Sequence, residues 1–141
     1  MRWEFQAADA GAARFSRRAF VEVLRSLCAA SSDFSAAELV FTELVANVVR
    51  HAPGPIHVAV ETLGCGTVML AVTDTGAPFA IAPCLPPSAD LSDGGRGLFI
   101  VANLCPRLSV FRTAYGNTVQ AVLPVEALSQ ASAPTAPTGP G

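Results

Sequence analysis

Lysine is absent from this chain, and all nine of its basic residues are arginines. Eleven acidic residues outnumber them, which gives a formal net charge of -2 at pH 7. A chain without a basic excess is poorly suited to neutralise a phosphate backbone, so we expect no nucleic-acid partner. Because lysine is missing, any side-chain cation that meets a phosphate group must be an arginine, and the candidates are Arg50 and Arg96.

Long apolar runs are also lacking. No stretch is long enough to span a bilayer, and the opening residues MRWEFQAADA contain no apolar signal core. We therefore expect a cytoplasmic protein that does not contact a membrane. The cysteines are far apart, without the C-x-x-C spacing of zinc or redox sites, so we expect buried or reduced thiols at Cys28, Cys65, Cys84 and Cys105.

A length of 141 residues with 51% hydrophobic residues is enough for one domain with a substantial core. We assign this domain to residues 1–125. Beyond Gln130 the chain contains only Ala, Ser, Pro, Thr and Gly, a composition that favours disorder. We therefore expect a disordered tail over residues 126–141.

Hydrophobic periodicity predicts the order strand, helix, helix, strand, strand, long loop, helix, strand, strand. In the second helix, Ser35 and Glu38 have the spacing of a capping box. The order predicts an α+β two-layer sandwich, in which a mixed, mostly antiparallel sheet carries helices on one face. The strands are expected at residues 3–8, 56–63, 67–73, 108–113 and 118–123, and the last helix at 97–104.

A polar stripe runs along the second helix, because Glu43, Asn47, Arg50 and His51 are spaced to share one helical face. An amide oxygen from Asn47 suits a magnesium ion that is also bound by phosphates. Glu43 could orient or deprotonate an attacking hydroxyl. Taken alone, the stripe is more typical of a solvated helix face.

Asp74-Thr-Gly76 follows the second strand of a predicted hairpin. A carboxylate such as that of Asp74 can accept a hydrogen bond from an exocyclic amine, for example that of adenine. Gly76 allows the backbone to approach a flat group closely. The same tripeptide is also common in simple turns, so its specificity depends on the other motifs.

A glycine-rich segment, Asp93-Gly-Gly-Arg-Gly-Leu98, precedes the last predicted helix. Free backbone N–H groups and the helix dipole at such a position favour an anionic phosphate, and Arg96 adds a positive charge. The segment fits neither a Walker A loop nor a dinucleotide-binding fingerprint. A flexible hinge before a helix is the alternative interpretation.

Three segments together carry a family resemblance: ELVANVVRHA from Glu43, Asp74–Gly76, and GGRGLFIV from Gly94. In order and spacing they resemble the N, G1 and G2 boxes of the GHKL ATPase superfamily. Within it, residues 1–125 resemble the bacterial anti-sigma factor serine/threonine kinases. The resemblance implies a histidine-kinase-like ATPase domain, the Bergerat fold, with ATP and Mg²⁺ as cofactors.

The resemblance also implies a role for individual residues. Glu43 would be the general base, Asn47 the magnesium ligand, and Asp74 the acceptor for the adenine amino group, with Gly76 packed by the purine. Residues 77–93 would form an ATP lid, which here is unusually rich in proline. The remaining nucleotide-binding residues would be Arg50, His51, Pro78, Gly94, Gly95, Arg96, Gly97, Leu98 and Thr118, the last supporting a water network at the adenine.

The implied function is a serine/threonine kinase that phosphorylates an anti-anti-sigma protein of the STAS type, while another surface binds a sigma factor. A homodimer through the first strand or helix is also implied. A histidine-kinase catalytic domain would need a phosphorylatable histidine on a dimerisation helix, which we do not expect before Met1. Two other interpretations stay open: a nucleotide-dependent switch without catalysis, and a structural domain that binds no nucleotide.

Overall fold

The computed structural model describes residues 1–51, 54–76, 95–114 and 116–128. The side chains of His51 and of residues 95–98 are outside this description, as are Pro78, Cys84, Gly94, the expected lid and the chain from residue 129 onward. In chain order the elements are β1 (Arg2–Gln6), α1 (Ala10–Leu27), α2 (Phe34–His51), β2 (Pro55–Thr62), β3 (Val68–Asp74), α3 (Gly95–Leu104), β4 (Leu108–Arg112) and β5 (Asn117–Val122).

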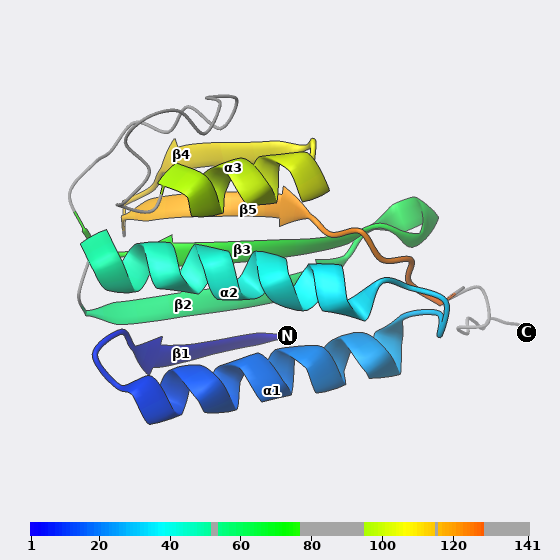
Figure 1. Cartoon of the computed structure of the whole chain (residues 1–141), viewed down its shortest axis with the longest axis horizontal. Helices are drawn as coiled ribbons and strands as arrows, with labels where there is room; N and C mark the ends of the chain where they lie inside the picture. Colours follow the sequence, from blue (N-terminus) through cyan, green and yellow to red (C-terminus); the bar gives the residue numbers. More distant parts are fainter. Residues whose placement is uncertain (52–53, 77–94, 115, 129–141) are drawn as a thin grey trace, which may run out of the picture.

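The molecule has two layers, a sheet and a row of helices. The five strands are ordered β1-β2-β3-β5-β4, and all four pairings between them are antiparallel. Figure 1 shows α1, α2 and α3 side by side over one face of this sheet, with α2 in the middle. The predicted α+β class with helices on one face is confirmed, and the described strands contain no parallel pair of the kind a mixed sheet would have.

The core lies between the layers. On β2 and β3 every second side chain faces the helices, as expected for strands with one buried face. The six residues concerned are at most 2% exposed: Ile56, Val58, Val60, Val68, Leu70 and Val72. Stacked rings of Phe20 and Phe41, with centroids 4.6 Å apart, join α1 to α2 above them. Each such buried side chain contributes about 1.5–3 kcal/mol of hydrophobic stabilisation.

The start of α2 differs from the expected capping box. The helix begins at Phe34, and Oδ1 of Asp33 accepts a hydrogen bond from the Ala36 N–H at 3.0 Å. The Ser35 cap is therefore wrong. An aspartate that already satisfies a first-turn N–H two residues earlier leaves Ser35 inside the helix.

The three cysteines in the described residues are free thiols with two different environments. Cys28 and Cys105 are buried, and burial raises the pKa of Cys105 to about 11 and also raises the pKa of Cys28. Cys65 is exposed in the short turn Gly64–Gly66 between β2 and β3, with a positive φ of 65°. Cys65 is thus a free thiol as expected, exposed because a tight hairpin turn projects its middle residue into solvent.

The chain after β5 remains attached to the domain. The Ala127 N–H donates to the Gly66 carbonyl at 2.8 Å, and the Leu128 N–H donates to the Leu27 carbonyl at 2.7 Å. Ala127 is 8% exposed and forms an isolated antiparallel β-bridge with Cys28. Residues 126–128, which we assigned to the tail, therefore close the end of α1 instead.

The three sequence motifs meet at one end of the domain. Figure 1 shows the C-terminal end of α2, the end of β3 and the beginning of α3 together at the left, next to the turn between β4 and β5. This follows from the hairpin, because β2 runs away from that end and β3 returns to it. None of the helices in the described residues is long and apolar enough to cross a membrane.

Candidate functional site

Glu43 and Asn47 lie one turn apart on α2, on the flank that faces away from α1. Glu43 is half-buried and Asn47 is 5% exposed. Within the described part of the chain, neither side chain has a hydrogen-bond or ion-pair partner. The amide of Asn47 is therefore not committed to another described residue, and it can accept from or donate to a ligand.

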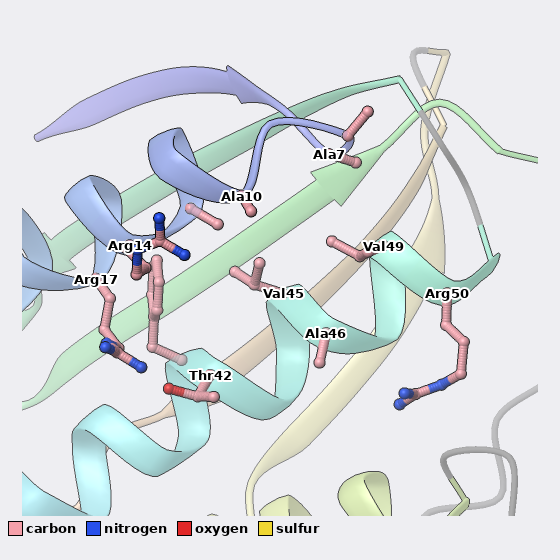
Figure 2. Close-up of a pocket in the computed structure, with 12 residues that line it drawn as sticks. Ala7, Ala10, Arg14, Arg17, Thr42, Val45, Ala46, Val49 and Arg50 are labelled. Atoms are coloured by element: carbon pink, nitrogen blue, oxygen red, sulfur yellow. The ribbon is translucent and has the colours of Figure 1, made fainter.

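The other two members of the polar stripe lie at the C-terminal end of α2. Arg50 is exposed on the last turn of α2, and His51 is the final residue of that helix. Figure 2 shows Arg50 near the end of α2, where it lines the same hollow between α1 and α2 as Arg14 and Arg17. Arg50 therefore stands at the motif-bearing end of α2, with its guanidinium in solvent.

Asp74 is held at the end of β3 and is only 2% exposed. Its Oδ1 atom accepts from the Gly76 N–H at 2.7 Å and from Nδ2 of Asn117 at 3.0 Å. The first contact is the local turn that aspartate favours. The second oxygen, Oδ2, has no hydrogen-bond donor among the described residues. One carboxylate oxygen is thus committed to the protein, and the other is left to accept from a ligand.

Arg112 and Asn117, which face each other across β4 and β5, brace the same turn. Nη1 of Arg112 donates to the Gly76 carbonyl at 2.8 Å and to Oδ1 of Asn117 at 3.3 Å. Nδ2 of Asn117 also donates to the Gly76 carbonyl at 3.3 Å. The motif Asp74–Gly76 is therefore fixed by side chains from a distant part of the sequence.

Gly116 allows the two segments to approach this closely. Its φ is +150°, and a Cβ atom placed on it would lie 1.6 Å from the Asp74 carbonyl oxygen. Only glycine fits such a contact. Sequence reasoning found a turn here but missed Arg112, Gly116 and Asn117 as site residues, because the signal needed was the strand register that pairs Asn117 with Asp74.

Thr118 lies next to Asn117 on β5 and points to the other face of the sheet. It pairs with Thr73, and the two Oγ1 atoms lie 2.7 Å apart on the sheet face opposite the Asp74 side chain. Successive residues of a strand point to opposite faces, so the position beside the Asp74 carboxylate belongs to Asn117. Thr118 therefore does not lie beside the Asp74 carboxylate.

The glycine loop leads directly into α3, which begins at Gly95 rather than at Gly97. Both glycines consequently lie in the first turn, where backbone N–H groups have no acceptor within the helix. Such a turn carries partial positive charge and is suited to a phosphate. The nucleotide contacts expected of the Arg96 and Leu98 side chains, Pro78 and Gly94 fall outside the described residues.

A separate groove lies between α1 and α2 (Figure 2), and neither Glu43 nor Asn47 lines it. Its volume is about 530 Å³, and apolar residues such as Val45, Ala46 and Val49 line it. Arg14 and Arg17 stand at its rim, and α1 carries four arginines against one glutamate. The groove is thus apolar with a basic border.

Comparison with known proteins gives two matches of different kinds. Residues 5–123 match the family model described as the histidine kinase-like ATPase domain. Among solved structures, the crystal structure of the RsbU and RsbW domains of Rv1364c from Mycobacterium tuberculosis aligns with a TM-score of 0.61 at 22% identity. The alignment covers 89% of this chain and 32% of that one, so at this identity the likeness shows the fold. No curated protein gave a significant match.

Proposed function

This chain belongs to the histidine kinase-like ATPase family, and we propose that it uses Mg-ATP to phosphorylate a serine or threonine of a partner protein. One observation carries the proposal: the unpartnered amide of Asn47 and the carboxylate of Glu43 stand one turn apart, at the end of the domain where Asp74 offers a free oxygen. These polar groups suit the binding of a nucleotide, whereas Asn47 and Glu43 make no side-chain hydrogen bond that would stabilise the described fold.

The residues present fit magnesium and a purine nucleotide. Amide and carboxylate oxygens are the ligands that Mg²⁺ takes alongside phosphates. When bound, Mg²⁺ neutralises charge on the phosphates. Asn47 would hold the metal through Oδ1, and Asp74 would accept from the purine amino group. The first turn of α3, with Gly95 and Gly97, would contribute N–H groups to the phosphates.

Glu43 would act on the acceptor hydroxyl. Its carboxylate takes the hydroxyl proton while the new O–P bond forms and the bond to ADP breaks, and ADP leaves with the electron pair of that bond. Arg50 and Arg96 are the cations proposed for the phosphates in a chain without lysine. His51, Pro78, Gly94 and Leu98 complete the proposed nucleotide contacts.

The proposed partners are a sigma factor and an anti-anti-sigma protein of the STAS type, as the motifs' resemblance to anti-sigma factor kinases implies. The groove between α1 and α2 supports a protein partner, because its apolar floor and arginine border suit an acidic amphipathic segment. A cytoplasmic location and a homodimer belong to the same proposal.

Two substitutions separate metal binding from catalysis. Asn47→Ala should weaken ATP binding at least about tenfold in Mg²⁺ and have little effect in EDTA, since the amide acts through the metal. Glu43→Gln should leave ATP affinity within about twofold and reduce phosphotransfer about a hundredfold or more. Asn103→Ala is the matched control, because Asn103 is an exposed amide on α3 that bonds only its own helix.

The measurements are nucleotide affinity by calorimetry and phosphoserine or phosphothreonine by mass spectrometry, with a STAS-type protein as acceptor. Equal ATP affinity in Asn47→Ala and the wild type, with Mg²⁺ present, would overturn the metal assignment. Tight Mg-ATP binding without any phosphoprotein would instead favour a nucleotide-dependent switch that binds and sequesters a regulatory partner.

A further inference from the structure

We propose that Asn117 and Arg112 are positioning residues that hold Asp74 in the orientation which selects a purine with a 6-amino group. The inference rests on the proposed nucleotide site and adds residues from β4 and β5 that the three sequence motifs do not contain. It concerns base specificity rather than the phosphoryl transfer itself.

The first step is the orientation of the Asn117 amide. An asparagine side chain can present either its oxygen or its NH₂ group to a neighbour. Here Nη1 of Arg112, a donor only, lies 3.3 Å from Oδ1 of Asn117 and so holds the amide oxygen on its own side. The NH₂ group must then face Asp74 and the Gly76 carbonyl, as the structure shows.

The second step is the state of the Asp74 carboxylate. Its Oδ1 receives two donors, the Gly76 N–H at 2.7 Å and Asn117 Nδ2 at 3.0 Å, one from its own turn and one from β5. These contacts fix the rotation of the carboxylate and leave Oδ2 as its only oxygen without a donor among the described residues. Asp74 as a whole is only 2% exposed, so its carboxylate has little room to turn.

The third step is discrimination between bases. A carboxylate oxygen accepts hydrogen bonds and cannot donate them, so it pairs with the 6-amino group of adenine. A 6-oxo group, as in hypoxanthine, places one acceptor against another and leaves a buried charge unpaired, which a polar site penalises strongly. When the Asp74 carboxylate is held in one rotation, it cannot turn away from a 6-oxo group. The loss of affinity for a 6-oxo purine is therefore larger than it would be for a carboxylate that rotates freely.

The test compares ATP with ITP, which differs at the 6-position of the base, in Mg²⁺ by calorimetry. The wild type should bind ATP at least about tenfold more tightly than ITP. Asn117→Ala should lose about tenfold in ATP affinity and little in ITP affinity. The ratio of ATP affinity to ITP affinity should therefore fall to about one. Arg112→Ala should reduce the ratio about threefold, and Arg112→Lys, which keeps a donor, should restore most of it. Gln120→Ala, a polar residue of β5 on the opposite sheet face, should not change the ratio.

The outcomes separate this inference from the proposed function. If the wild type binds no ATP, the proposed function fails and the inference fails with it. If the wild type binds ATP and ITP equally, the role of Asp74 is wrong although nucleotide binding stands. If the wild type discriminates and Asn117→Ala discriminates equally well, positioning is refuted alone. Arg112 is exposed, so its variants keep the test decisive even where Asn117→Ala does not fold.

Discussion

Replacing Gly116 by alanine should cost this protein more stability than any other glycine substitution described here. A Cβ at residue 116 would lie 1.6 Å from the Asp74 carbonyl oxygen and 2.9 Å from the Thr75 Cα. Both neighbours are backbone atoms, which cannot swing aside as a flexible side chain does. The φ of +150° adds strain of its own for any residue that carries a Cβ.

The expected magnitude follows from these two terms. Overpacking a tight contact costs about 1–3 kcal/mol, and holding a non-glycine residue at such a φ costs about 1–3 kcal/mol more. We therefore expect Gly116→Ala to lower the free energy of unfolding by about 3 kcal/mol or more, which corresponds to about 10 °C in Tm for a domain of this size. The displacement would also move Asp74, so ATP affinity should fall.

The assay is urea and thermal unfolding followed by the fluorescence of Trp3, the only tryptophan in the chain. Gly64→Ala is the matched control, because nothing lies within 4 Å of a Cβ added there. Its stability should stay within about 1 kcal/mol of the wild type. Similar unfolding midpoints for Gly116→Ala, Gly64→Ala and the wild type would refute the close approach between Gly116 and the end of β3.

Three further outcomes are expected. Asp33→Ala should destabilise the protein by about 1 kcal/mol in urea unfolding, whereas Ser35→Ala should be nearly neutral, because Asp33 caps α2. Peptide-resolved thiol labelling at pH 8 should modify Cys65 rapidly and Cys105 slowly, since Cys105 is buried and its pKa of about 11 keeps it protonated; equal rates would contradict this. Arg14→Glu should weaken capture of an acidic partner segment about tenfold without changing ATP affinity, and an unchanged partner affinity by calorimetry would exclude the groove as its site.

The helices and strands were predictable because their side chains follow simple periods. The stripe from Val40 to Val48 and the alternation along β2 and β3 each indicate one buried face, and the structure has both. The fold class followed from the order of these elements. The ends of elements were harder, since Asp33 and Ser35 are both good caps and only their geometry decides between them.

The surroundings of Asp74 in the candidate site could be predicted only in part. Asp74 was identified because it belongs to a local motif, but its partner lies 43 residues away and depends on register. Thr118 was expected near the adenine from the family resemblance alone, whereas the register puts the neighbouring Asn117 beside Asp74, because successive residues of a strand point to opposite faces. The sequence could not single out Arg112, because exposed arginines at the ends of strands are common. Its role becomes visible only from its hydrogen bond to the Gly76 carbonyl.

The place of β5 in the sheet bears on how the protein is made. It is the last strand to be synthesised among those described, yet it lies between β3 and β4. A nascent chain that has reached only the end of α3 therefore contains Glu43, Asn47 and Asp74 but not the amide that steadies the carboxylate. On the ribosome, the turn at Asp74 should accordingly reach its final arrangement late and abruptly, once β5 has entered the sheet.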